Sequence, residues 1–159
     1  MPVSLGGVSS GRLGRMSTFT EREVAYLAGQ PLGRLATVGR DGRPSVRPVG
    51  VIYDPEAEAL VIGGVAGSGM AGSKKFRDVA ERPDVSFVID DLATTDPWAP
   101  RGIEVRGHAE ARTDGGEEVG RRLGAPFPFE AAWILIRPRR VLAWGIDTGS
   151  YRLTARDVA

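Results

Sequence analysis

The chain has 159 residues, of which 42% are apolar and 26% charged, and its formal net charge is +1. These values are typical of one globular domain with a real core, and the net charge of +1 gives no electrostatic footprint for nucleic acid or an anionic membrane. The absence of cysteine excludes disulfides, thiolate catalysis and cysteine metal sites, while the single histidine, His108, argues against histidine metal centres and a Ser-His-Asp triad.

The N-terminal segment is rich in Gly, Ser and Arg and has no periodicity. We therefore expect residues 1–18 to form a disordered extension, with Met16 as an alternative start, and residues 19–159 to form the domain. No apolar run approaches the ~20 residues of a membrane span, and the N-terminus lacks the apolar core of a secretory signal. A cytoplasmic location is expected.

A helix is predicted to begin after Thr20, because Thr20 and Glu23 have the spacing of a capping box. Val24 and Leu27 would form its apolar face, and Gly29 would end it. The residues that follow favour strands. Ranges 35–38, 45–53 and 60–62 are separated by short polar turns, so these three strands are predicted to be antiparallel neighbours.

The second half of the chain also reads mainly as strands. Residues 85–89 and 101–112 are strand candidates, the latter with apolar and polar residues in alternation. A helix is predicted over 117–123, with Glu117–Arg121 and Glu118–Arg122 as ion pairs. Two last strands are predicted over 132–136 and 141–146, joined by residues 137–140. About seven short strands with few helices indicate a mainly β, barrel-like fold of one domain.

An anion site is predicted where residues 63–72 form a glycine-rich loop before a short helix. Lys74 and Lys75 open that helix and are the chain's two lysines, against nineteen arginines. Free N–H groups at a helix start favour a phosphate, glycines let the backbone approach it, and lysine adds a point charge. The alternative is that both lysines are solvated residues of an amphipathic helix, with Phe76 and Val79 in its buried stripe.

Two better-known phosphate motifs compete with this interpretation. Residues 67–72 fit G-x-G-x-x-G, and Asp90 follows near the spacing expected for a ribose-binding acid. The short helix and the lack of further strand–helix alternation disfavour a dinucleotide fold. The P-loop pattern fails, because Gly72 is followed by Ser-Lys and not by Lys-Ser/Thr. Asp90 and Asp91 are assigned no catalytic role.

The order of these elements resembles the split-barrel flavin-binding family of pyridoxamine 5′-phosphate oxidase-like proteins, and most closely its deazaflavin-dependent actinobacterial branch. The resemblance covers residues 19–147, and the Arg-rich, Lys-poor composition is typical of high-GC actinobacterial genomes. The segments that carry it are residues 33–38, 42–49, 73–78, 98–102 and 140–145. Each segment is short, and their order and spacing make the resemblance specific.

The resemblance implies a split β-barrel of about six to seven antiparallel strands with short flanking helices, and a homodimer with two cofactor sites at its interface. The cofactor would be the deazaflavin coenzyme F420 or FMN, with the deazaflavin favoured. The implied cofactor-binding residues are Arg47, Pro48, Val49, Ser73, Lys74, Lys75, Trp98, Arg101 and Trp144. Lys74 and Lys75 would hold the phosphate, and Arg77 is a further candidate for the acidic tail of the deazaflavin.

The chain also departs from the oxidase itself, because its tail has no Arg-x-His and His108 lies within a predicted strand. Pyridoxine phosphate oxidation is thus disfavoured. We expect an oxidoreductase that transfers hydride between the reduced cofactor and a small organic substrate, with no side-chain acid or base required. The alternatives are a flavin-binding carrier or sensor without turnover, an FMN-dependent oxidase-like enzyme, and a β-barrel binding module without a flavin.

Overall fold

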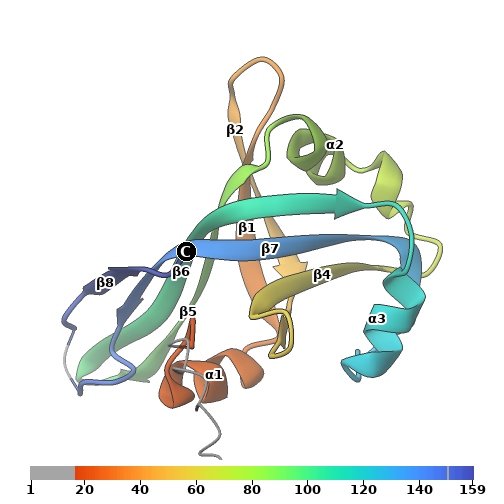
Figure 1. Cartoon of the computed structure of the whole chain (residues 1–159). Coiled ribbons are helices and arrows are strands. Elements are labelled where there is room, and N and C mark those ends of the chain that lie inside the picture. Colours follow the sequence, from red (N-terminus) through yellow and green to blue (C-terminus); the bar gives the residue numbers. More distant parts are fainter. Residues whose placement is uncertain (1–16, 150) are drawn as a thin grey trace, which may run out of the picture.

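The computed structural model describes residues 17–149 and 151–159, so nearly all of the predicted N-terminal extension lies outside the described residues. In the described part, eight strands form one sheet with three α-helices and a 3₁₀-helix (Figure 1). Every strand pair in it is antiparallel. This confirms the predicted mainly β split barrel, and it excludes the parallel dinucleotide-binding fold.

The strands follow the order β2-β1-β5-β6-β7-β4-β3, and β8 pairs with β7. Their bounds are β1 (Leu32–Val38), β2 (Pro44–Gly50), β3 (Ile52–Asp54), β4 (Ala59–Val65), β5 (Asp84–Thr95), β6 (Trp98–Arg112), β7 (Phe129–Trp144) and β8 (Thr154–Asp157). The long strand β7 pairs with β6 on one edge. On its other edge it pairs with β4 in its first half and with β8 in its second.

The helices are short; one precedes the first strand, and the others lie between strands. They are α1 (Glu21–Ala28), the 3₁₀-helix η1 (Met70–Gly72), α2 (Lys74–Glu81) and α3 (Gly116–Arg122). The predicted capping box is confirmed at α1: the Thr20 hydroxyl accepts from the Glu23 N–H at 3.2 Å, and the Glu23 carboxylate accepts from the Thr20 N–H at 2.9 Å. Among the described residues, no helix has the length and apolar character needed to cross a membrane.

Two predicted strand assignments were wrong. The strand predicted over 45–53 is two strands, because the chain changes partner near Val51: β2 pairs with β1, whereas β3 pairs with β4. The two strands predicted over 132–146 are the single strand β7, which continues through Pro138. A proline has no N–H to donate, and the pairing with β6 shifts register beside it, between Arg106 and Gly107.

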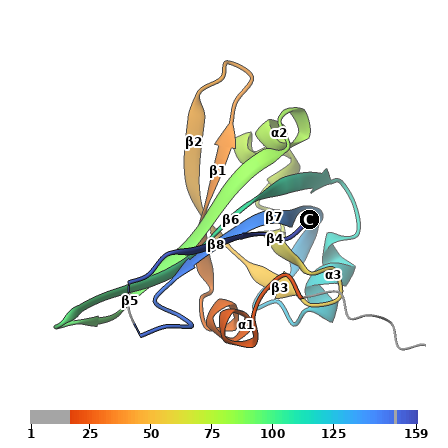
Figure 2. The ribbon, with the colours of Figure 1, turned by 60° about the vertical axis from the view of Figure 1, so that its left-hand side comes forward.

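The core lies on both faces of β4. Leu60 and Ile62 belong to the main cluster, whereas Ala59 and Val61 pack in a second cluster around Phe129. Since successive side chains of a strand point to opposite faces, this explains the uninterrupted apolar run of β4. Figure 1 shows α1 and α3 on either side of the β3–β4 hairpin, while the β1–β2 and β5–β6 hairpins project from the body in different directions in Figure 2.

The predicted ion pairs of α3 were also wrong. Arg121 pairs with Glu118 one residue closer than expected, and Arg122 turns away from its own helix. It binds both carboxylate oxygens of Asp54, at 2.6 and 3.2 Å. Asp54 is 2% exposed, and the Arg122 guanidinium keeps the pKa of that carboxyl below its ordinary value. The pair therefore ties α3 to the end of β3.

Candidate functional site

A cavity of about 820 Å³, which we call the larger cavity, lies between α1, the β2–β3 segment, β4 and the loop after α3. Its walls are mostly apolar and include Leu27, Pro48, Val49, Tyr53 and Phe127. A volume of this size is within the range of pockets that bind cofactors and drug-sized ligands. The cavity is therefore the candidate cofactor site.

Lys75 is the one residue with a formal charge among the described residues that line this cavity. The lining also includes Ser68 from the glycine-rich loop. Within the described chain, no carboxylate lies within ion-pairing distance of the Lys75 amine. The Lys75 charge is nevertheless close enough to Glu130 to contribute to the lowered pKa of that carboxyl. An ammonium beside apolar walls and a hydroxyl is the set of groups that a phosphorylated aromatic cofactor needs, so these residues fit one.

Lys74 lies on the same helix but serves a different partner. Its amine donates to the Asp78 carboxylate at 2.6 Å, and the Thr37 hydroxyl donates to the same oxygen at 2.7 Å. Asp78 is 6% exposed. Its burial alone would raise its pKa, but the hydrogen bonds from Lys74 and Thr37 outweigh burial, and the pKa lies below its ordinary value. Asp78 thus attaches α2 to β1 through Thr37, while Lys74 forms an ion pair within α2 and does not line the cavity.

We expect Lys74→Ala to lower stability at neutral pH and to have less effect in acid. Asp78 has a depressed pKa in the folded state, so its contribution is present above the ordinary value of 3.8 and is lost as pH falls through the folded pKa. Urea unfolding of wild type and Lys74→Ala, from pH 7 into the acid range, measures the difference in their stability. A difference in stability that stayed constant through that range would contradict the assignment.

The glycine-rich loop already holds a carboxylate of this chain. Glu130 accepts hydrogen bonds from the Ser68 hydroxyl and the Gly69 N–H, each at 3.2 Å, and a shorter one from the Met70 N–H. These bonds, led by that from Met70, keep the pKa of Glu130 below its ordinary value. Because Gly69 has a φ of +77°, the loop forms a concave set of donors of the kind that binds anions. Glu130 fills it, which leaves Lys75 as the candidate phosphate ligand.

Removing this carboxylate should loosen the loop. In Glu130→Ala we expect faster amide hydrogen exchange over residues 66–72 and weaker cofactor binding, because Lys75 then follows a loop without its anchor. Glu110→Ala is the matched control, since that carboxylate also lies on a strand, but it pairs with Arg112 and Arg137 on the β6–β7 surface, away from the loop. Unchanged exchange over 66–72 in Glu130→Ala would show that the loop holds its shape without Glu130.

Arg101 lies in a second, smaller cavity of about 500 Å³ near the end of α1. Its guanidinium binds both oxygens of Asp91, at 2.7 and 2.9 Å, and lies 5.2 Å from the centre of the Tyr26 ring. Tyr26 and Gln30 also donate to Asp91, at 3.0 Å each. The Arg101 guanidinium lowers the pKa of Asp91, and burial raises that of Tyr26. Asp91, to which the sequence assigned no role, thus anchors α1 to the β5–β6 hairpin.

The other predicted site residues lie at four places. Arg47 is exposed on β2 beside Pro48, and Ser73 is the N-cap of α2, where its hydroxyl accepts from the Phe76 N–H at 3.4 Å. Trp98 is 69% exposed at the start of β6. Trp144 packs its ring over Gly102, so closely that a Cβ there would lie 2.4 Å from it. The cavity of this one chain therefore gathers Pro48, Val49 and Lys75, and leaves the two tryptophans elsewhere.

Three residues of the cavity region were missed by sequence reasoning: Tyr53, Phe127 and Glu130. Phe127 precedes β7 in a proline-rich turn, and its ring lies 5.5 Å from that of Phe129. An aromatic residue between two prolines was the available signal for it. Nothing in the sequence links Glu130 to a loop about 60 residues earlier. Among the described residues, no group of His, Asp and Glu side chains is placed to hold a metal ion.

Known sequences resemble this chain over most of its length. A family model described as pyridoxamine 5′-phosphate oxidase matches residues 19–151. A Streptomyces rimosus protein named 5a,11a-dehydrotetracycline/5a,11a-dehydrooxytetracycline reductase is 41% identical over 142 residues, which cover 88% of this chain and 93% of that protein. These matches support an oxidoreductase.

Solved structures share the fold. An F420 reductase superimposes with a TM-score of 0.53 at 25% identity, covering 73% of this chain and 93% of that one. A heme binding protein from Mycobacterium smegmatis has a TM-score of 0.62 at 22% identity, covering 86% of this chain and 57% of that one, and shows the fold alone. With the family model spanning most of the sequence, the chain belongs to the pyridoxamine 5′-phosphate oxidase family.

Proposed function

We propose that this protein is a reductase that uses the deazaflavin coenzyme F420 to reduce a carbon–carbon double bond in a flat, fused-ring enone. The observation that carries the proposal is the 41% identity, over nearly the whole chain, to a protein named as a reductase of dehydrotetracyclines. The likeness to an F420 reductase supports the deazaflavin over FMN. The mostly apolar cavity, with a single ammonium, supports a large aromatic ligand that carries a phosphate.

The residues of the cavity bind and orient, while a bound reduced deazaflavin supplies the hydride. Lys75 would meet the phosphate, and the walls formed by Pro48, Val49 and Phe127 would exclude water from the ring system. An enone substrate gains hydride at one alkene carbon and a solvent proton at the other. The cavity lining includes no carboxylate or histidine among the described residues, so we assign this proton transfer to no side chain.

We further propose that a second copy of the chain completes the site. Leu32 and Val65 both line the cavity, and they are 56% and 50% exposed. Apolar side chains exposed at the edge of a ligand cavity support an interface that covers them. Sedimentation analysis should give a homodimer, and Leu32→Glu should shift it to monomers with weaker cofactor binding. A monomeric wild-type protein that binds cofactor with full affinity would contradict the shared site.

The test of the function has two stages. Mass spectrometry of any small molecule released on denaturation, followed by titration with F420 and FMN, identifies the cofactor. Absorbance of the reduced cofactor is then followed with fused-ring enones, quinones and nitro compounds. We expect turnover with a fused-ring enone. Binding without any turnover would favour a carrier or sensor, and failure to bind either cofactor would favour a binding module without a flavin.

A further inference from the structure

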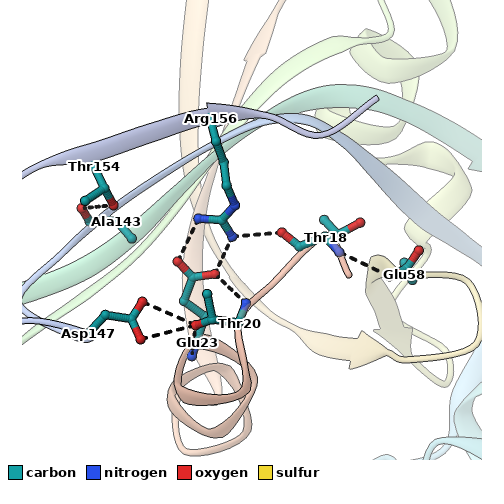
Figure 3. Close-up of polar contacts among 8 residues, drawn as sticks. All are labelled: Thr18, Thr20, Glu23, Glu58, Ala143, Asp147, Thr154 and Arg156. Carbon is teal, nitrogen blue, oxygen red and sulfur yellow. Dashed lines mark hydrogen bonds and ion pairs between the residues drawn. The ribbon is translucent and has the colours of Figure 1, made fainter. Parts of the chain in front are cut away.

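A fully buried carboxylate lies at the start of α1. Glu23 is 0% exposed, and Arg156 of β8 donates to both of its oxygens, with Nη1 at 3.0 Å from Oε1 and Nη2 closer still to Oε2 (Figure 3). The Thr20 N–H donates to Oε2 as well. A buried carboxylate without its partner is strongly unfavourable, so the position of Glu23 depends on that of Arg156.

Arg156 reaches α1 from the far end of the chain. It lies on β8, where it is paired in register with Val141 of β7, and its Nη2 also donates to the Thr18 carbonyl at 2.8 Å. The Thr154 hydroxyl donates to the Ala143 carbonyl at 3.2 Å and adds a side-chain bond between β8 and β7. The backbone of Arg156 is thus fixed to β7, and its guanidinium holds the segment that leads into α1.

The segment held by Arg156 also forms part of the cavity. Val24 and Leu27 of α1 line it. Phe19 packs edge-on against Tyr53, another lining residue, with ring centres 5.3 Å apart. The Thr18 N–H donates to Glu58 at 3.1 Å, which joins the same segment to the β3–β4 turn. Any displacement of residues 18–23 would therefore move two walls of the cavity.

We propose that Arg156 is a positioning residue for the ligand cavity: through Glu23 it holds α1, and through the Thr18 carbonyl it holds the segment whose Phe19 packs against Tyr53. The cofactor's identity rests on the proposed function, while the geometry does not. The neighbouring residue on β8 supplies the matched control. Asp157 forms an exposed pair with Arg140 at 2.7 Å, so Asp157→Ala removes an ion pair from the same strand without touching α1.

The experiment compares wild type, Arg156→Ala, Arg156→Lys and Asp157→Ala at a temperature where circular dichroism shows each to be folded. Hydrogen exchange over residues 20–28 should be faster in Arg156→Ala, with residues 116–122 unchanged. Cofactor affinity should fall about 10-fold, because a displaced α1 no longer holds Val24 and Leu27 against the ligand. Millimolar guanidinium should restore it in part, because the ion can enter the space left by the side chain. Asp157→Ala should match wild type in both measurements.

Arg156→Lys keeps the positive charge but cannot bind both Glu23 oxygens and Thr18 together, so its loss of cofactor affinity should lie between those of wild type and Arg156→Ala. It replaces Arg156→Ala in the comparison if that variant does not fold. A folded Arg156→Ala with wild-type exchange over residues 20–28 would overturn the proposal. If the wild-type protein binds neither cofactor, the proposed function fails by itself. Hydrogen exchange over residues 20–28, and binding of an apolar dye in the cavity, would then still be compared between wild type and Arg156→Ala to decide whether Arg156 holds α1.

Discussion

Replacing Lys75 by alanine should weaken binding of F420 and of FMN by about 10- to 150-fold. A hydrogen bond to a charged group contributes about 1.5–3 kcal/mol, and every 1.4 kcal/mol is about tenfold in Kd. Lys75 is the one residue with a formal charge among the described residues that line the larger cavity, so within this chain no neighbouring cation there replaces it. Fluorescence titration of the folded variant measures the loss.

The adjacent lysine provides the control for this prediction. Lys74→Ala removes the same charge from the same helix, but its amine is held by Asp78 at 2.6 Å, so cofactor affinity should change little. Riboflavin, which is FMN without its phosphate, gives a second control: the loss caused by Lys75→Ala should disappear with it. Equal losses for FMN and riboflavin, or a larger loss in Lys74→Ala, would show that Lys75 does not bind the phosphate.

Phe129→Ala should lower the free energy of unfolding by about 3–5 kcal/mol, the usual cost of removing a buried phenylalanine side chain. Phe129 is 4% exposed and fills the space between two glycines. A Cβ built on Gly63 would lie 2.3 Å from its ring, and one on Gly120 would lie 2.9 Å from it. Because the ring is enclosed on both sides, the surrounding chain cannot close the space that it leaves. Urea denaturation measures the change.

A comparison of Phe127→Ala with Phe129→Ala distinguishes an effect on binding from an effect on stability. Its ring is next to that of Phe129 and lines the same cavity, but it is only partly buried. Phe127→Ala should therefore lower stability by much less than Phe129→Ala, while it weakens cofactor or substrate binding because one apolar wall is lost. If Phe127→Ala were as destabilising as Phe129→Ala, Phe127 would be a core residue and not a wall of the site.

Local signals in the sequence were sufficient for parts of the fold. The capping box at Thr20 and Glu23 predicted α1, because both hydrogen bonds connect residues three apart. Alternation predicted most of β6 in the same way. Long-range pairing could not be read from these signals. The stretch after Pro44 has strand character throughout, but only the sheet shows that β2 pairs with β1 and β3 with β4.

Neither strand β8 nor the ion pair that it brings to α1 was predicted. Residues 151–157 have no clear apolar alternation, and Arg156 and Glu23 are 133 positions apart. The two lysines show the same limit at the site. Composition singled out Lys74 and Lys75 together, because both stand at the start of one helix. The structure separates them, since Lys74 is held by the buried Asp78 and Lys75 lines the cavity.

The most direct test is a crystal structure of the protein with F420 bound. The cofactor ring should lie in the larger cavity, against Pro48 and Val49, and a phosphate oxygen should lie within hydrogen-bonding distance of Lys75 Nζ, with Glu130 still bound to the Gly69 and Met70 N–H groups. A phosphate bound away from Lys75, or one that replaces the Glu130 carboxylate on the loop, would contradict the assignment of Lys75 as the phosphate ligand.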